Sequence, residues 1–270
     1  MTTRARPSKL KQQLPSSVNR QTHEPATALR IQQLHLNLDG NTILQQVNLN
    51  LPRQGMTSVI GPSGAGKSSL LRCINGLHQD WRGQIDLNSQ NIRHWKGGWE
   101  QLRKQIGLIP QKPCVFPQSI RSNITFGLSR KQSRNSAPLE EQTLRQAALW
   151  DEVKDRLDSP AEQLSLGQQQ RLSIARALAI KPQVLLLDEP TASLDPRSKQ
   201  LIEQSILQLA ETMPVLCVTH DLAQAQRFGG QVIFMCDGKV IEQGACQTFF
   251  KQPQKLESKE FLRWSVCDCD

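Results

Sequence analysis

The chain has 270 residues, of which 37% are hydrophobic and 21% are charged, so it is long enough for one large domain or two small ones with a full core. No apolar stretch approaches the run of about 20 residues that crosses a bilayer, and no apolar segment follows the basic N-terminus as it would in a secretory signal. We therefore expect a globular protein that stays in the cytosol, either free or held by a partner.

Much of the excess positive charge, out of a net +9, lies in the first segment of the chain. Residues 1–28 contain many Pro, Ser, Gln and Thr and few apolar anchors, which predicts a disordered basic tail. A basic surface can bind nucleic acid or an acidic membrane, but no clustered aromatic residues accompany the basic ones, as a platform for single strands requires. We therefore favour solubility over nucleic-acid binding as the reason for the charge.

The cysteines are odd in number and scattered, without a C-x-x-C pair. Most of them lie in apolar runs, which predicts buried, reduced thiols. Cys267 and Cys269 alternate with Asp268 and Asp270 at the chain end, where two ligands make a poor metal site. The full set is Cys73, Cys114, Cys217, Cys236, Cys246, Cys267 and Cys269.

The first ordered stretches have the pattern of half-buried strands. Residues 29–31, 34–38 and 43–51 alternate apolar and polar side chains, and Asp39-Gly40-Asn41 forms a turn signal between them. These stretches predict an antiparallel sheet that packs as a layer beside a parallel core.

Residues 61–68 read Gly-Pro-Ser-Gly-Ala-Gly-Lys-Ser and fit the phosphate-binding loop pattern G-x-x-x-x-G-K-[ST] at every fixed position. A short buried strand is expected before the loop, over 56–60, and a helix opens after it, over 69–72. The glycines let successive backbone N–H groups point into one concavity, and the positive end of the helix adds to that field. Lys67 is expected to reach the β- and γ-phosphates of a nucleotide, and the Ser68 hydroxyl to hold Mg²⁺. The loop residues expected to hold the nucleotide are Gly61, Pro62, Ser63, Gly64, Ala65, Gly66, Lys67, Ser68 and Ser69.

The rest of the chain alternates short apolar runs with stretches of helical spacing. Such runs between helices indicate a parallel sheet covered on both faces, and therefore an α/β fold. The expected strands cover residues 83–88, 106–111, 184–189 and 215–220, the expected helices 139–157 and 168–180, and a final hairpin turns at Asp237-Gly238 between 232–235 and 239–241.

Polar residues follow three of the apolar strands, where an open α/β sheet places its nucleotide site. Asp188 is expected to hold Mg²⁺, and Glu189, next to it, to polarise the attacking water as a general base. Gln111 can hold a water or a metal, and His220 can donate to a γ-phosphate. Alone, Gln111 or His220 would more often be a surface polar residue; their shared placement at strand ends favours catalysis.

A second anion site is expected where Leu164-Ser165-Leu166-Gly167-Gln168 leads into a helix. Ser165 is a good N-cap, and the helix start attracts an anion. A single chain has no evident use for both this site and the phosphate loop, but a two-fold dimer would let each loop's nucleotide meet the other chain's helix.

Together these segments resemble an ATP-binding-cassette (ABC) ATPase over about residues 29–266. In that resemblance Gln111 is the Q-loop glutamine, residues 164–171 are the signature, 184–189 the Walker B strand, 193–195 the D-loop and His220 the switch histidine. It implies a P-loop NTPase fold with a mostly parallel sheet, an N-terminal antiparallel β layer and an inserted helical subdomain over about 112–180. It also implies ATP and Mg²⁺ as cofactors. The roles it implies are catalysis for Glu189, His220 and Gln111; nucleotide contacts for Ser165, Gly167, Gln168 and Asp195; and metal contacts for Ser68, Gln111 and Asp188.

Within that family the segments around 111–127, 147–157 and 168–172 are similar to the ATP-binding subunits of phosphate importers. The resemblance implies a phosphate-transporting ATPase that works as a homodimer at the cytoplasmic face of the membrane. Its expected partners are two permease subunits and, through them, a solute-binding protein, and no nucleic acid. Three alternatives stay open: the ATPase of another importer, a soluble ABC ATPase that acts on nucleic acid or ribosomes, and a module that binds ATP but barely hydrolyses it.

The sequence departs from the family pattern at two positions that bear on the nucleotide. Leu166 stands where the signature usually has glycine, and Asp39 stands where the family places an aromatic ring on the adenine. The chain contains no tyrosine at all.

Overall fold

The computed structural model describes residues 1–2 and 27–266, with side chains as far as Trp264. Almost all of the tail predicted over 1–28 lies outside the described residues, as does the end of the chain at 267–270, with Cys267 and Cys269. The first strand begins at Thr27, two residues before the strand expected from Leu29.

The predicted antiparallel layer is a four-stranded sheet in the order β2-β1-β4-β5. The two short stretches expected over 29–31 and 34–38 are one strand with an irregular register between Ile31 and Leu34, where Gln33 has φ 49°. Such a bulge shifts the alternation by one residue, so Ile31 and Leu34 can both face the core. The strands of this sheet are β1 (Thr27–Leu38), β2 (Asn41–Pro52), β4 (Trp81–Leu87) and β5 (Gln90–Asn91).

The second sheet has six strands in the order β10-β9-β3-β8-β7-β6, all parallel except β10, which forms the predicted hairpin with β9. Its central strands are buried on both faces, as their continuous apolar runs indicated. The α/β fold with a mostly parallel sheet and an antiparallel layer is confirmed. The strands are β3 (Gly55–Ile60), β6 (Ile106–Ile109), β7 (Val184–Asp188), β8 (Pro214–Val218), β9 (Gln231–Cys236) and β10 (Lys239–Ala245).

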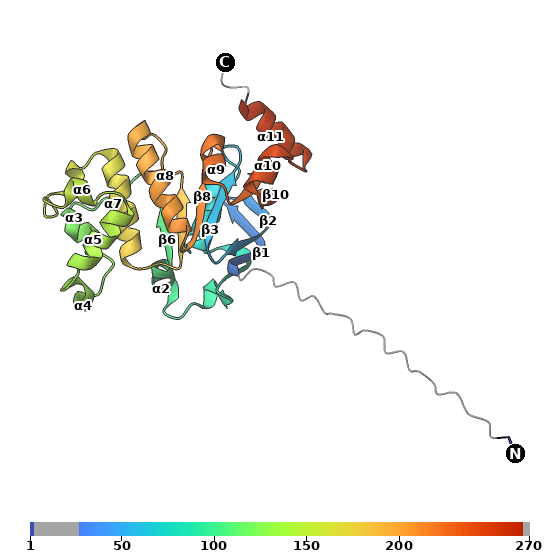
Figure 1. Cartoon of the computed structure of the whole chain (residues 1–270), viewed down its shortest axis with the longest axis horizontal. Helices are drawn as coiled ribbons and strands as arrows, with labels where there is room; N and C mark the ends of the chain where they lie inside the picture. The colour runs from blue at the N-terminus through green and yellow to red at the C-terminus, as the bar shows by residue number, and fades with distance from the viewer. Residues whose placement is uncertain (3–26, 267–270) are drawn as a thin grey trace.

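The helices gather at the two ends of the molecule and over the parallel sheet. In Figure 1, α3 to α7 form a group at one end, α10 and α11 lie at the other, and α8 and α9 cover the sheet between them. The helices are α1 (Lys67–Ile74), α2 (Gly98–Gln105), α3 (Ile120–Thr125), α4 (Arg130–Ser133), α5 (Ala137–Gln146), α6 (Trp150–Val153), α7 (Leu166–Ala179), α8 (Pro196–Ala210), α9 (Leu222–Phe228), α10 (Cys246–Lys251) and α11 (Leu256–Val266), with 3₁₀ turns η1 (Ile92–His94) and η2 (Ala161–Gln163).

The single helix expected over 139–157 is wrong. The structure has two helices there, α5 and α6, and Ala148 between them has φ 51°. A residue in the left-handed region ends a helix. The apolar residues Leu144, Ala147 and Val153 are nevertheless all buried, so the pattern indicated the buried face and missed the break.

The parallel sheet lies between two apolar layers. Leu186 and Val218 belong to the cluster that includes the antiparallel sheet and α1, whereas Leu185 and Cys217, on the opposite face, belong to the cluster shared with α3, α5, α7 and α8. Because both faces are packed, the carboxyl ends of the strands are fixed relative to one another. No helix within the described residues is both long and apolar enough to span a membrane.

Most of the described cysteines are buried thiols, as expected. Cys73, Cys217 and Cys246 are buried, and burial raises the pKa of Cys73 to about 12. A thiol with so high a pKa stays protonated and unreactive near neutral pH.

Candidate active site

The phosphate loop lies between β3 and α1, and its backbone needs glycine. Gly61 has φ 148°, and a Cβ on it would lie 2.0 Å from the carbonyl oxygen of Met235 in the neighbouring strand. No larger residue fits so close to another backbone, so this position requires glycine. The following helix begins at Lys67 and directs its unpaired N–H groups towards the loop.

Lys67 lies inside the loop. Its residue is 7% exposed, and its Nζ donates 2.8 Å hydrogen bonds to the carbonyl oxygens of both Gly61 and Pro62. Burial lowers the pKa of the Lys67 ammonium, while the nearby Glu189 and Asp188 act in the opposite direction. The loop therefore surrounds a single partly desolvated cation at the mouth of the sheet.

Ser68 and Asp188 form a pair of oxygen ligands beside the loop. The Ser68 hydroxyl donates to Asp188 Oδ1 over 2.8 Å, although the two residues are 120 positions apart in sequence. Asp188 is 9% exposed, and burial raises the pKa of its carboxyl above the ordinary value despite the hydrogen bond from Ser68. A hydroxyl and a buried carboxylate make a ligand set that suits a hard cation such as Mg²⁺.

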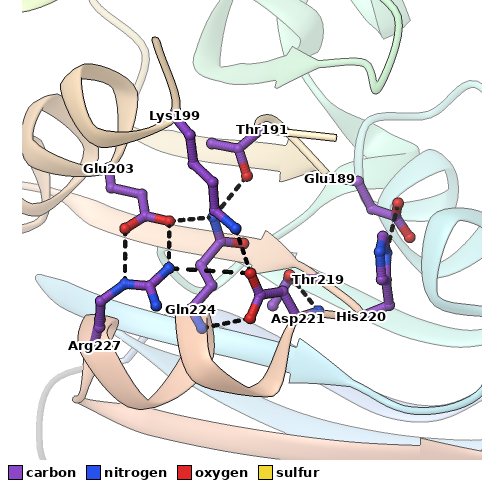
Figure 2. Close-up of polar contacts among 9 residues, drawn as sticks. All are labelled: Glu189, Thr191, Lys199, Glu203, Thr219, His220, Asp221, Gln224 and Arg227. Atoms are coloured by element: carbon purple, nitrogen blue, oxygen red, sulfur yellow. Dashed lines mark hydrogen bonds and ion pairs between the residues drawn. The ribbon is translucent and has the colours of Figure 1, made fainter. Parts of the chain in front are cut away.

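Glu189 is the point at which the other predicted catalytic residues meet. Its Oε2 accepts a 3.1 Å hydrogen bond from Gln111 Nε2. The same oxygen lies 2.9 Å from Nδ1 of His220 (Figure 2). Glu189 has φ 48°, and its N–H donates to the carbonyl oxygen of Val218 at the end of β8. The chain thus leaves the strand alternation at Glu189, and a carboxylate 20% exposed comes to face Gln111 and His220.

Four predicted nucleotide contacts lie in a second cluster, at the starts of α7 and α8. Ser165 caps α7 in a capping box: its Oγ accepts from Gln168 N, and Gln168 Oε1 accepts from Ser165 N. Asp195 caps α8 by a single hydrogen bond, which its Oδ1 accepts from Ser198 N. A Cβ on Gly167 would lie 2.3 Å from Ser198 Oγ, so the two helix starts touch. No hydrogen bond among the described residues joins this cluster to the phosphate loop.

The α7 start is held from behind by an ion pair. Glu152 accepts from Gln168 Nε2 over 2.7 Å and pairs with the buried Arg171 over 2.6 Å. Leu166, the residue that departs from the family signature, is 48% exposed and leaves Ser165 and Gly167 in place beside it.

The turn between β1 and β2 carries Asp39 in an exposed position with φ 49°. The turn lies near the phosphate loop, because a Cβ on Gly66 would lie 2.8 Å from the carbonyl oxygen of Ile43, early in β2. Residues 27–60 contain no Phe, Tyr or Trp, and the imidazole of His35 on β1 is their one aromatic ring. Apart from that imidazole, the first three strands offer no aromatic ring that could stack on a base.

A groove beside the Gln111 segment lies between β6, α7 and the residues that follow α3. It has a volume of about 500 Å³ and is lined mainly by apolar side chains, among them Phe116, Phe126 and Ile180. The rings of Phe116 and Phe126 lie 4.2 Å apart, and Arg176 lies over Phe116. Phe126 is 60% exposed at this groove.

Sequence reasoning missed a set of polar residues behind His220. Asp221 pairs with Lys199, and Gln224 contacts Thr191 and Glu203 (Figure 2). The one signal in the sequence was the spacing Asp221-x-x-Gln224, which is typical of a helix start; Asp221 does cap α9.

Comparison with known proteins identifies the class. The sequence matches the ABC transporter family over residues 44–192. The parallel sheet also has the fold of solved family structures. A bacterial Atm1-family ABC exporter with ATP bound superposes with a TM-score of 0.76 at 25% identity, covering 92% of this chain and 44% of the exporter chain. The protein cbiO1 from Clostridium perfringens, described as part of the ABC transporter complex cbiONQ, superposes with a TM-score of 0.73 at 28% identity and covers 90% and 99% of the two chains. The chain belongs to the ABC transporter family.

More similar relatives are phosphate import ATP-binding proteins named PstB. The chain is 43% identical over 244 residues to the one from Shewanella denitrificans, covering 87% of this chain and 90% of the relative. It is 44% identical over 244 residues to the one from Pseudoalteromonas translucida, covering 87% and 89%. The resemblance to this branch of the family, drawn from the motifs, is confirmed.

Proposed function

We propose that this chain is the ATP-hydrolysing subunit of an importer of inorganic phosphate, and that it works as a homodimer with Mg²⁺ on two permease subunits. The observation that carries the proposal is the convergence of Gln111 and His220 on Glu189, directly beside the Ser68–Asp188 pair. Three segments far apart in sequence supply these groups. Family membership and the 42–44% identity to phosphate import ATP-binding proteins support the same function.

The phosphate loop binds the nucleotide. Its backbone N–H groups and the Lys67 ammonium hold the β- and γ-phosphate oxygens, and the start of α1 adds a favourable field. Ser68 and Asp188 hold Mg²⁺, which when bound supplies positive charge against the phosphate oxygens. The described residues contain no group of three His, Cys, Asp or Glu that could hold a metal alone. Such a sparse protein ligand set suits Mg²⁺, because this ion takes its remaining ligands from phosphate and water.

Glu189 acts as the general base. It takes a proton from the attacking water, whose oxygen bonds to the γ-phosphorus while the bond from that phosphorus to the bridging oxygen breaks, giving ADP and phosphate. Gln111 and His220 orient the Glu189 carboxylate, and His220, at 64% exposure, is free to reach the γ-phosphate.

A second copy completes each site. The capped starts of α7 and α8, with Ser165, Gly167, Gln168 and Asp195, form an anion-binding surface that makes no hydrogen bond to the loop of its own chain. A two-fold dimer places this surface of one subunit over the phosphate loop of the other.

The apolar groove beside the Gln111 segment binds the permease. It accepts an apolar helical segment between Phe116, Phe126 and Ile180, and the segment from Gln111 to Gly127 connects the groove to the catalytic cluster. The helices of about 112–180 act here as a subdomain that moves with the permease. This arrangement keeps the subunit at the cytoplasmic face of the membrane, where the permease in turn meets a solute-binding protein.

Two measurements test the proposal. The full-length chain is expected to hydrolyse ATP in the presence of Mg²⁺, and Lys67→Ala is expected to abolish both nucleotide binding and hydrolysis. Cells from which this chain has been deleted are expected to lose uptake of radiolabelled phosphate but keep uptake of sulfate, and the parent chain but not Lys67→Ala restores it. Unchanged phosphate uptake with normal ATP hydrolysis would assign the ATPase to another solute or to a function outside transport.

A further inference from the structure

A network of polar side chains lies directly behind the Glu189–His220 pair and joins three separate segments. Thr191 follows Glu189 in the loop after β7, Glu203 and Lys199 lie on α8, and Gln224 lies on α9 (Figure 2). We call Thr191, Lys199, Glu203, Asp221, Gln224 and Arg227 the α8–α9 network.

Gln224 is the centre of the network. It is 1% exposed, and its Nε2 donates to Thr191 Oγ1 over 2.7 Å and to Glu203 Oε1 over 2.9 Å. A buried amide must make its hydrogen bonds inside the protein, so these two contacts fix the distance between the loop, α8 and α9.

Glu203 provides the anchor on α8. Its carboxylate accepts from Arg227 through both Nε, at 3.0 Å, and Nη2, at 2.8 Å, in addition to the bond from Gln224. A forked arginine–carboxylate pair restricts both position and angle. The two helices are therefore joined by a contact that resists sliding and rotation.

Asp221 provides the anchor at the start of α9. It caps this helix through Gln224 N and pairs with Lys199 of α8. Burial acts to raise the pKa of the Asp221 carboxyl, but the hydrogen bond from Lys199 and the other favourable contacts outweigh burial, and the pKa lies below its ordinary value. Asp221 is thus ionised near neutral pH. Its ion pair with Lys199 holds the chain next to His220 against α8.

We propose that the α8–α9 network consists of positioning residues for ATP hydrolysis. They fix the positions of Glu189 and His220 relative to each other and to Asp195, the N-cap of α8. The proposal rests on the proposed ATPase function. The network is linked to the catalytic residues through short stretches of backbone. Thr191 is two residues from Glu189, in a turn closed by a 3.1 Å hydrogen bond from Ala192 N to Glu189 O. Asp221 is adjacent to His220 in sequence. The same helix α8 begins at Asp195, so a shift of its anchor is transmitted to the surface that meets the second copy.

The test removes the hydrogen bonds of Gln224 while the side chains keep nearly the same size. Thr191→Val removes the hydroxyl that Gln224 contacts, Thr191→Ser keeps it, and Gln224→Met removes both donors. Ser205→Ala is the matched control, because Ser205 is buried on α8 but donates only to Leu201 of its own helix. For each full-length variant, kcat and KM for ATP hydrolysis, the dissociation constant of a non-hydrolysable ATP analogue with Mg²⁺, and the unfolding midpoint are measured.

A displacement of about 1 Å at a catalytic group costs up to roughly a hundredfold in rate. We expect Thr191→Val and Gln224→Met to lower kcat about tenfold or more while KM and analogue binding stay within about threefold, because the phosphate loop is untouched. Thr191→Ser should have the kcat of the parent. The double variant Thr191→Val/Gln224→Met should lose no more activity than Gln224→Met alone, since the two substitutions remove the same hydrogen bond.

The possible outcomes separate the two proposals. Unchanged kcat in both Thr191→Val and Gln224→Met, with normal ATPase activity in the parent, overturns the positioning role and leaves the ATPase function standing. A loss of kcat that Ser205→Ala shares, or that follows the unfolding midpoint in all variants, also overturns it, because general destabilisation then explains the effect. A parent chain that does not hydrolyse ATP overturns the proposed function and this inference together.

Discussion

Replacement of Glu189 by glutamine is the sharpest test of the catalytic cluster. The substitution keeps the side chain's size, and the amide can still contact Gln111 and His220 across the distances of 3.1 and 2.9 Å seen for the carboxylate. It removes only the ability to accept a proton. Loss of a general base costs about two to four orders of magnitude in rate, which corresponds to about 3–5 kcal/mol of transition-state stabilisation.

The assay measures phosphate release at saturating Mg²⁺ and ATP, together with analytical ultracentrifugation. We expect Glu189→Gln to bind ATP as the parent does, to turn over at least a hundredfold more slowly, and to accumulate as a dimer with ATP retained, since the composite site closes but does not hydrolyse. Glu211→Gln is the control, because it makes the same chemical change at an exposed acid just after α8, at the opposite end of that helix from Asp195. Steady-state hydrolysis by Glu189→Gln within a few-fold of the parent would refute the assignment of the base.

Three further predictions follow from the site. Ser165→Arg should impair hydrolysis by blocking the helix start that receives the partner's nucleotide, and mixing it with Lys67→Ala should restore one working site per mixed dimer if sites act singly; a fully active Ser165→Arg contradicts the composite site. Because burial raises the pKa of Asp188, this carboxyl takes up a proton at a higher pH than an ordinary aspartate. The Mg²⁺ concentration for half-maximal hydrolysis should therefore begin to rise, as the pH falls, above the pH at which an ordinary aspartate is protonated. An Mg²⁺ concentration that stays constant down to that pH argues against Asp188 as a metal ligand. Base–aromatic stacking is worth roughly 1–3 kcal/mol, so Asp39→Tyr should tighten ATP binding severalfold in equilibrium titrations and the parent should discriminate weakly between ATP and GTP; a hundredfold preference of the parent for ATP shows that another group holds the base.

Local sequence patterns predicted the structure correctly where interactions within a few residues determine the backbone conformation. The phosphate loop, the strand before it and the N-cap at Ser165 follow from glycine, burial and hydrogen-bonding rules that act over a few residues. The break at Ala148 did not follow, because its flanking apolar residues keep the spacing of one continuous helix. The break is set by tertiary contacts that periodicity does not contain: α5 packs against α7, and Arg171 of α7 donates to the carbonyl oxygen of Ala148.

The α8–α9 network shows why long-range polar contacts escape such reasoning. Lys199 and Glu203 are four residues apart on one helix, which predicts that they pair with each other. In the structure each instead pairs with α9: Lys199 with Asp221 and Glu203 with Arg227. The choice depends on the crossing of two helices, and a contact 22 or 24 residues away cannot be read from spacing along either one.

The proposed division of labour between Asp188, as metal ligand, and Glu189, as general base, depends on one backbone angle. Both are acids at the end of the same apolar strand, and composition alone does not say which holds metal and which moves a proton. Asp188 continues β7, so its carboxylate stays buried against Ser68. Glu189 adopts φ 48°, a conformation that costs an L-residue about 1–2 kcal/mol. Strain of this kind persists where the surrounding structure imposes it, and here the bond from Glu189 N to Val218 and the contacts with Gln111 and His220 do so. The turn separates two adjacent carboxylates into two environments, one desolvated beside a hydroxyl and one open to water between an amide and an imidazole. A metal ligand and a general base require those two environments, respectively.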